Sequence, residues 1–489
     1  MDLLGTASLL MTVAALFAYF NYRFIRLPTT IGIMVISLVF SISMVLLSKT
    51  GVTFGVEYTE KLLSGVDFDA TLMEGMLSFL LFAGALHINL NELKDKAWVV
   101  GVLASIGVIT STFLVGIAAY FLLGLFGLEM PFIYCLLFGS LIAPTDPVAV
   151  LAILKTANAS KSLETKIAGE SLFNDGIAVV VFLVVLGIAI GDSHAATPLG
   201  AAKLFLQETI GGAIFGFIIG YFVYRLLKSI DNYHVEVLLT LALVMGGYAA
   251  ARAMHLSGPI AIVVAGLLIG NQGRSFAMTD TTRENLDTFW ELIDEILNAV
   301  LFMLIGLEVI VLSIQGDYII TGIVMFFVVL AARFTAVGIP VSIMKLRQSF
   351  HPHVISILTW GGIRGGISVA LALSLPKGTE RDIIVAITYV IVIMSVTAGS
   401  VNQVAGAVCR QTVSGDDNRP VEKPDRIKYG RDDGRSGEPD VLARLYKGLL
   451  SSYIGFAPII LPTRTTVIKL NSHQAREHRY NSENSIHTC

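Results

Sequence analysis

Long apolar stretches alternate with short polar connections along most of the chain. A helix needs about 20 mostly apolar residues to cross a bilayer. On this criterion the pattern predicts an all-α polytopic membrane protein with about thirteen transmembrane helices. The predicted segments are 3–20, 29–48, 72–90, 97–124, 131–154, 163–190, 201–227, 234–254, 257–271, 286–313, 318–344, 353–376 and 382–409.

The composition supports a membrane protein. Hydrophobic residues make up 54% of the chain and charged residues 15%, whereas a soluble domain carries roughly 25% charge. The chain therefore has too little polar surface for a water-soluble fold of this size. Its net charge of -3 gives no indication of a nucleic-acid partner.

The distribution of lysine and arginine predicts the orientation. With the N-terminus outside, the loops on the inner side carry 13 of these residues and the outer loops carry 6. Positive charge accumulates in cytoplasmic loops. We therefore expect the N-terminus outside and the C-terminus in the cytoplasm.

The composition changes abruptly after Arg410, which divides the chain into a transmembrane domain (1–410) and a cytoplasmic tail (411–489). Residues 411–440 are rich in Asp, Arg, Gly and Pro, as in a disordered linker. Residues 441–462 are apolar again but contain Pro and basic residues. An interfacial helix is the interpretation we favour for them over another span.

Ionisable residues inside the apolar segments are candidates for function, because a charge in the bilayer costs roughly 2.5–3.5 kcal/mol. The central ones are Asp146, Glu170, Asp175, Arg333 and Arg364. Two further carboxylates, Glu295 and Glu308, fall within segment 286–313. We expect these two near the helix ends, in contact with water.

Two segments contain sequences that interrupt a helix. Residues 143–147 read Ala-Pro-Thr-Asp-Pro, and residues 360–366 read Trp-Gly-Gly-Ile-Arg-Gly-Gly. Proline removes a backbone donor, and each glycine costs a helix about 1 kcal/mol relative to alanine. The two segments are seven apart in the order of helices and therefore run in opposite directions. We expect segments one to six to repeat as eight to thirteen in inverted topology, an arrangement typical of secondary transporters.

Polar residues form a stripe on segment 163–190. Ser171 and Asp175 are four residues apart, as are Glu170 and Asn174, so all four share one helix face. We expect this face to lie against Thr145 and Asp146. Such hard oxygen ligands suit a small cation, and the alternative is a structural hydrogen-bond network.

The buried arginines need partners. Glu170 is the natural partner of Arg333, because each would otherwise be an unpaired charge in a medium of low dielectric constant. We expect Arg364 to face the ends of the broken helices. Both arginines would then hold the site without touching the ion.

The chain resembles the monovalent cation:proton antiporter-1 family, the bacterial relatives of the sodium/proton exchangers, over roughly residues 1–410. The resemblance rests on FGSLIAPTDPVAV around Asp146, GESLFNDGIAVVVF around Asp175, LFMLIGLE at 301–308 and WGGIRGGISVALAL around Arg364. One departure occurs in LLFAGALHINL, where many members have a glutamate and this chain has Ala83. This departure bears on ion selectivity.

The resemblance implies a specific ion site. Asn174 and Asp175 would form it with Thr145, Asp146 and Ser171, and sodium would bind at Asp175, Asp146, Ser171 and Thr145. The resemblance also implies the Glu170–Arg333 pair. It further implies a homodimer in the bacterial inner membrane, with a dimerisation part and a six-helix core that contains two crossed, broken helices.

The expected activity is exchange of sodium or lithium for protons, with no cofactor. A proton and a cation would compete for Asp175, and Asn174 in place of a second aspartate favours electroneutral one-to-one exchange. A potassium/proton antiporter would use the same ligands, and a cation channel is the alternative of another class. The chain lacks the HExxH, GxSxG and Walker-type motifs of common enzyme classes.

Overall fold

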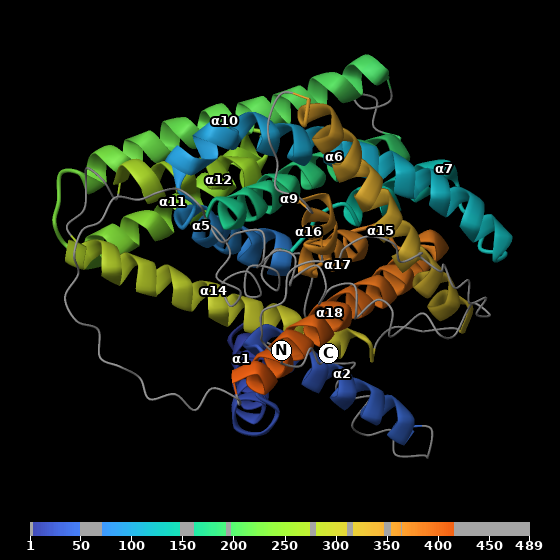
Figure 1. Cartoon of the computed structure of the whole chain (residues 1–489). Coiled ribbons are helices and arrows are strands. Elements are labelled where there is room, and N and C mark those ends of the chain that lie inside the picture. The colour runs from blue at the N-terminus through green and yellow to red at the C-terminus, as the bar shows by residue number, and fades with distance from the viewer. Residues whose placement is uncertain are drawn as a thin grey trace, which may run out of the picture.

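The computed structural model describes residues 3–48, 71–146, 161–191, 197–273, 280–310, 316–346, 354–362 and 364–414. Within these ranges the chain is a bundle of helices (Figure 1). The α-helices are α1 (Leu3–Phe20), α2 (Thr29–Ser48), α5 (Leu77–Leu86), α6 (Leu90–Leu125), α7 (Phe132–Leu141), α9 (Lys161–Ala189), α10 (Pro198–Leu227), α11 (Tyr233–Ala253), α12 (Gly258–Leu268), α14 (Asp280–Glu308), α15 (Gly316–Met344), α16 (Val354–Trp360), α17 (Gly366–Leu373) and α18 (Thr379–Ser414). The π-helical turns are η1 (Asn21–Ile25), η2 (Thr71–Met76) and η3 (Ile269–Gly273).

The helices follow the apolar pattern of the sequence. Each of the predicted segments overlaps at least one helix of the described ranges. Eight stretches in these ranges are long and apolar enough to cross a membrane, and three shorter apolar helices accompany them. The all-helical membrane fold is therefore confirmed, while the number of crossings and their orientation stay predictions.

Helix α14 differs from the other long helices because its first half is acidic. Glu291, Asp294 and Glu295 add three charges within five residues, and the helix is not among the eight candidate spans. Its second half is apolar and contributes residues 300–305 to the main hydrophobic core. Helix α14 packs against α2, α5 and α17.

The helical path is interrupted at two places inside the bundle. Helix α7 ends at Leu141, and residues 142–146 leave the helical path. Helix α16 ends at Trp360, and α17 begins at Gly366. Helix α17 contacts both α7 and α9, so the second interruption lies beside the first. Whether the two broken helices cross stays a prediction, since residues 147–160 are outside the described ranges.

Helices α10 and α12 approach closely through small residues. Gly212, Gly216 and Gly220 form a buried stripe on α10. A Cβ atom on Gly212 would lie 2.8 Å from the carbonyl oxygen of Ser257, and one on Gly216 would collide with the backbone of Ala261. Small residues at four-residue spacing let membrane helices pack backbone to backbone. This contact fixes the position of α12 beside α9 and α5.

We expect Gly216→Ala to destabilise the protein by about 1–3 kcal/mol, because the added methyl group forces α10 away from α12. The measurement is the midpoint of thermal unfolding of the purified protein in detergent. Gly246→Ala is the matched control, since a Cβ on the exposed Gly246 of α11 meets nothing within 4 Å. Equal midpoints for both variants would contradict the close approach of α10 and α12.

The expected division into a transmembrane domain and a tail is only partly within the described ranges. Helix α18 continues to Ser414, a few residues past the expected end of its segment. Residues 415–489, which include the expected linker and the apolar segment 441–462, lie outside the described ranges.

Candidate functional site

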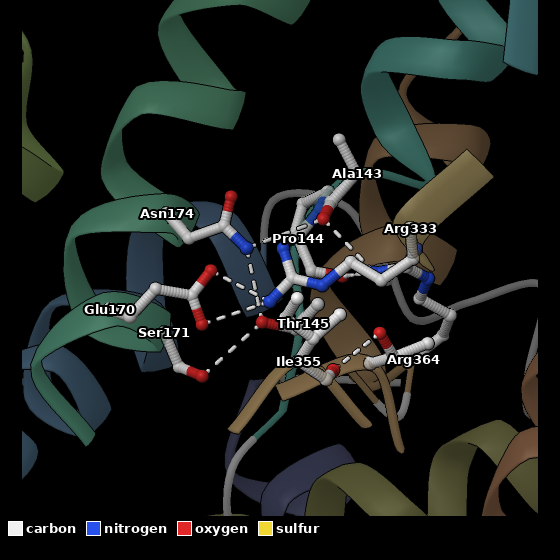
Figure 2. Close-up of polar contacts among 10 residues, drawn as sticks. Ala143, Pro144, Thr145, Glu170, Ser171, Asn174, Arg333, Ile355 and Arg364 are labelled. Carbon is white, nitrogen blue, oxygen red and sulfur yellow. Dashed lines mark hydrogen bonds and ion pairs between the residues drawn. The ribbon is translucent and has the colours of Figure 1, made fainter. Parts of the chain in front are cut away.

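Helix α9 carries four polar side chains into the interior of the bundle. Glu170, Ser171, Asn174 and Asp175 are 2%, 1%, 0% and 9% exposed, respectively. Their spacing places all four on one face of the helix, as the sequence predicts. This face lies toward the non-helical segment that follows α7 (Figure 2).

Thr145 is the centre of the contacts between α9 and the first interruption. Its hydroxyl group lies 3.2 Å from the hydroxyl of Ser171 and accepts a hydrogen bond from the amide of Asn174 at 3.0 Å. The same amide also lies 3.4 Å from the carbonyl oxygen of Ala143 (Figure 2). The structure thus brings together three of the predicted site residues, Thr145, Ser171 and Asn174.

The two aspartates lie in the same region. Both the backbone N–H of Thr145 and the charge of Asp146 act electrostatically on the carboxylate of Asp175. Asp146 packs against the second interruption, since a Cβ on Gly365 would lie 2.8 Å from Asp146 Oδ2. Asp146, the last described residue of the first interruption, therefore lies against the second interruption.

Two buried oxygen atoms on this face of α9, Oδ1 of Asp175 and Oδ1 of Asn174, are among those that have no hydrogen-bond partner in the described part of the chain. A buried carboxylate or amide oxygen without a donor is costly. Both atoms belong to adjacent residues of α9 and to the polar stripe. A small cation would satisfy them, because carboxylate, amide and hydroxyl oxygens are its preferred ligands.

Glu170 forms a buried ion pair with Arg333 of α15. Nη2 of the arginine lies 2.7 Å from Oε1 and 2.9 Å from Oε2 of the glutamate. Both residues are 2% exposed. Each compensates the other's charge in a region of low dielectric constant, so Glu170 is committed to Arg333.

Arg364 connects the two interruptions. Its Nη1 atom donates hydrogen bonds of 3.1 Å to the carbonyl oxygens of Ala143 and Pro144 (Figure 2). Its backbone N–H donates to the hydroxyl of Ser395 on α18 at 2.9 Å. The carbonyl groups that follow the end of α7 have no helical partner, and a guanidinium group is suited to them. The contacts of Arg364 are thus with the ends of the broken helices, as expected.

The remaining predicted positions lie away from this cluster. Glu295 is exposed on α14, and Glu308 is half-buried at the end of the same helix. Ala83 of α5 is 1% exposed and packs in an apolar cluster with Phe82, Leu86 and Trp290.

Sequence reasoning missed a polar pair on α14. Asp294 is half-buried and lies one helical turn before Asn298, and the charge of Asp146 acts on it. Asn298 is 8% exposed. The signal was the four-residue spacing of Asp294 and Asn298, which repeats that of the stripe on α9.

Comparisons with known proteins identify the family of the chain. The family described as "Sodium/hydrogen exchanger, transmembrane" matches residues 11–404. The Na(+)/H(+) antiporter NhaP of Pseudomonas aeruginosa is 48% identical over 425 residues, which is 86% of this chain and 99% of that protein. The Na(+)/H(+) antiporter NhaH of Halobacillus dabanensis is 35% identical over 332 residues, which is 67% of this chain and 80% of that protein.

A solved structure shares the fold. The sodium proton antiporter MjNhaP1 of Methanocaldococcus jannaschii superposes with a TM-score of 0.62 at 18% sequence identity, covering 81% of this chain and 95% of that one. The fold expected from the sequence is thus found in a membrane antiporter. The family match over most of the chain, together with the similarity to NhaP, confirms the resemblance seen in the motifs, and the chain belongs to the sodium/hydrogen exchanger family of transmembrane proteins.

Proposed function

We propose that the protein exchanges sodium or lithium for protons across the membrane by alternating access. The observation that carries this proposal is the buried carboxylate of Asp175, whose Oδ1 atom has no hydrogen-bond donor among the described residues. The names of the relatives, which are sodium/proton antiporters, support the same activity. We propose transport, and no enzymatic reaction or cofactor.

The cation would bind at Asp175, Asp146, Ser171 and Thr145. The hydroxyl groups of Ser171 and Thr145 lie 3.2 Å apart and supply neutral oxygen ligands, while the two aspartates supply the charge. Asn174 orients Thr145 through its amide nitrogen and leaves its own Oδ1 free of donors among the described residues. These oxygens can replace part of the hydration shell of a small monovalent ion.

Exchange follows when one carboxylate has two competing ligands. A proton or a cation can neutralise Asp175, and each excludes the other. The buried, low-dielectric surroundings disfavour an empty, ionised carboxylate, so the site moves between the two sides of the membrane in a loaded form. The Glu170–Arg333 pair and Arg364 hold the surrounding segments during this movement.

The proposal extends to the oligomeric state and the orientation of the protein in the membrane. We infer a homodimer in a bacterial inner membrane, with the N-terminus outside and the C-terminus in the cytoplasm. The core with the broken helices would move against the dimerisation part, as in alternating-access transporters. Residues 1–410 would form the transmembrane domain, and residues 411–489 would form the cytoplasmic tail.

Exchange is expected to be electroneutral, because one sodium ion replaces one proton at Asp175 while Asn174 cannot carry a second proton. The test uses well-buffered proteoliposomes with a trapped pH dye, in which valinomycin and a potassium gradient set a membrane potential of either sign. The sodium-driven rate should be the same at positive, zero and negative potential. A rate that follows the sign of the potential would overturn one-to-one stoichiometry.

The ion that is exchanged can be determined in the same vesicles. Sodium and lithium should each alkalinise an acidic lumen in a saturable way, and potassium should have little effect. A response to potassium alone would replace the substrate and keep the mechanism, since the same oxygen ligands serve both ions. A flux that does not saturate and does not move protons would favour a cation channel.

A further inference from the structure

A small cavity lies between α15, α16 and α18, beside the second helix interruption. Its volume is about 20 Å³, which is enough for one water molecule or one monatomic ion. The polar residues that line it are Arg333, Thr359, Arg364 and Ser395, and the other lining residues are apolar or glycine. No carboxylate is among the lining residues in the described part of the chain. The charge around this cavity is therefore positive.

The guanidinium group of Arg333 has one side toward Glu170 and another toward the interruption. Its Nη2 atom donates to the carboxylate of Glu170 at 2.7 Å and 2.9 Å. Its Nε atom is buried and has no hydrogen-bond partner within the described ranges. A Cβ on Gly362, which also lines the cavity, would lie 3.0 Å from this Nε atom. One N–H group of Arg333 is thus free to donate beside the second interruption.

Arg364 supplies two further donors and an uncompensated charge. Its Nη1 atom is engaged by the carbonyl oxygens of Ala143 and Pro144 (Figure 2). Its Nε and Nη2 atoms are buried and have no hydrogen-bond partner among the residues that the structure describes. Within the same residues Arg364 forms no ion pair with a carboxylate, in contrast to Arg333. A buried charge without a partner is costly, and a single negative charge in the cavity would compensate it.

The two hydroxyl groups of the cavity differ in what they can donate. The hydroxyl of Ser395 accepts the backbone N–H of Arg364 at 2.9 Å, which leaves its own proton to donate. The hydroxyl of Thr359 already donates to the carbonyl oxygen of Ile355 at 2.7 Å. Ser395 therefore adds a donor to those of the two arginines. A water molecule must also donate hydrogen bonds, whereas an anion accepts from every donor around it.

We propose that this cavity is a binding site for one monovalent, monatomic anion, which in the cell is chloride. Glu170 already compensates Arg333, so one negative charge is sufficient for Arg364. The small volume excludes phosphates and carboxylates. The anion would be held by Nε of Arg333, by Nε and Nη2 of Arg364 and by the hydroxyl of Ser395.

Anion binding is expected to favour cation binding. Arg364 holds the residues that directly precede Thr145 and Asp146, so the anion and the transported cation would lie on either side of one short segment. Opposite charges at this separation attract, and each ion then increases the affinity for the other by the same factor. This coupling rests on the proposed function, whereas binding of the anion does not.

The test of binding is the midpoint of thermal unfolding in detergent without sodium, with choline chloride replacing choline gluconate at constant ionic strength. For the wild type we expect a saturable rise of about 2–4 °C with chloride and the same rise with bromide. Arg364→Gln should lose the rise, and Ser395→Ala should need several-fold more chloride for half of it. Thr359→Val is the matched control, because it changes the lining but removes a hydroxyl already engaged by Ile355. It should retain the rise of the wild type.

Equal midpoints in chloride and gluconate would overturn the inference and leave the cavity to water. A full rise in Arg364→Gln would place the effect of chloride elsewhere and would overturn it too. If Arg364→Gln does not fold, Ser395→Ala decides, and an unchanged chloride requirement in that variant would contradict the site.

The coupling is tested in proteoliposomes, where chloride in place of gluconate should lower the apparent KM for sodium about five-fold. An equal KM in both salts would refute the coupling. Failure of the wild type to exchange sodium for protons would contradict the proposed function, while a rise of the midpoint in sodium-free detergent would still support the anion site.

Discussion

In Asp175→Asn protein, sodium-driven proton movement should fall to the level of protein-free liposomes. Asparagine has nearly the shape of aspartate but can neither bind and release a proton nor neutralise a cation. The oxygen atom that lacks a donor among the described residues, Oδ1 of Asp175, would lose its charge. Both halves of the exchange reaction depend on this one carboxylate, so the loss should be complete.

The measurement is the alkalinisation of an acidic vesicle lumen after external addition of sodium, lithium or potassium. Glu295→Gln is the matched control, since it removes a carboxylate of the exposed surface of α14 and should retain wild-type activity. Equal midpoints of thermal unfolding for the wild type and the variants, purified in detergent, would exclude a folding defect. Exchange by Asp175→Asn at the wild-type rate would show that the ion site lies elsewhere.

Glu170→Gln should be the most damaging substitution for stability, at about 3–5 kcal/mol. It leaves the guanidinium group of Arg333 buried at 2% exposure without the carboxylate that lies 2.7 Å away. An unpaired charge in such surroundings is far more costly than the loss of one hydrogen bond. We expect a large decrease in the midpoint of thermal unfolding in detergent.

The double variant Glu170→Gln/Arg333→Gln should recover part of the lost stability, because it removes both charges together. Asp382→Asn provides the surface control, since the pair of Arg381 and Asp382 is 3.7 Å apart with 23% and 66% of the side chains exposed. An exposed pair contributes about 0–1 kcal/mol. A double variant less stable than both single variants would argue against compensation of charge as the reason for the pair.

The hydrophobic pattern was sufficient to predict most of the helices. Helices α1, α2 and α15 begin and end within about two residues of the predicted segments, because a lipid environment demands a continuous run of apolar side chains. The pattern was less informative for α14, whose acidic first half begins at Asp280, six positions before the predicted start. A helix that packs against other helices can carry polar residues, because it does not need the continuous apolar surface that contact with lipid demands.

Local spacing also predicted the polar face of α9. The partners of this face were harder to predict, because they depend on the tertiary arrangement of distant segments. The hydrogen bonds from Arg364 to the carbonyl oxygens of Ala143 and Pro144 join positions more than two hundred residues apart. The residues that flank Ser395 gave no indication that its hydroxyl accepts a hydrogen bond from the backbone of Arg364. Asp294 was missed because acidic residues in its surroundings resemble the solvated end of a helix.

The hydrogen bonds of Arg364 to the segment after α7 have a consequence for the direction of transport. Because one guanidinium group holds the connection after α7 to the connection before α17, the ligands of the ion would keep their relative positions when the core moves. An ion site whose ligands keep their geometry binds the ion equally well whether it opens to one side of the membrane or to the other. Such a protein has no preferred direction of its own, and the ratio of the sodium gradient to the proton gradient alone would decide whether the cell expels sodium or takes it up.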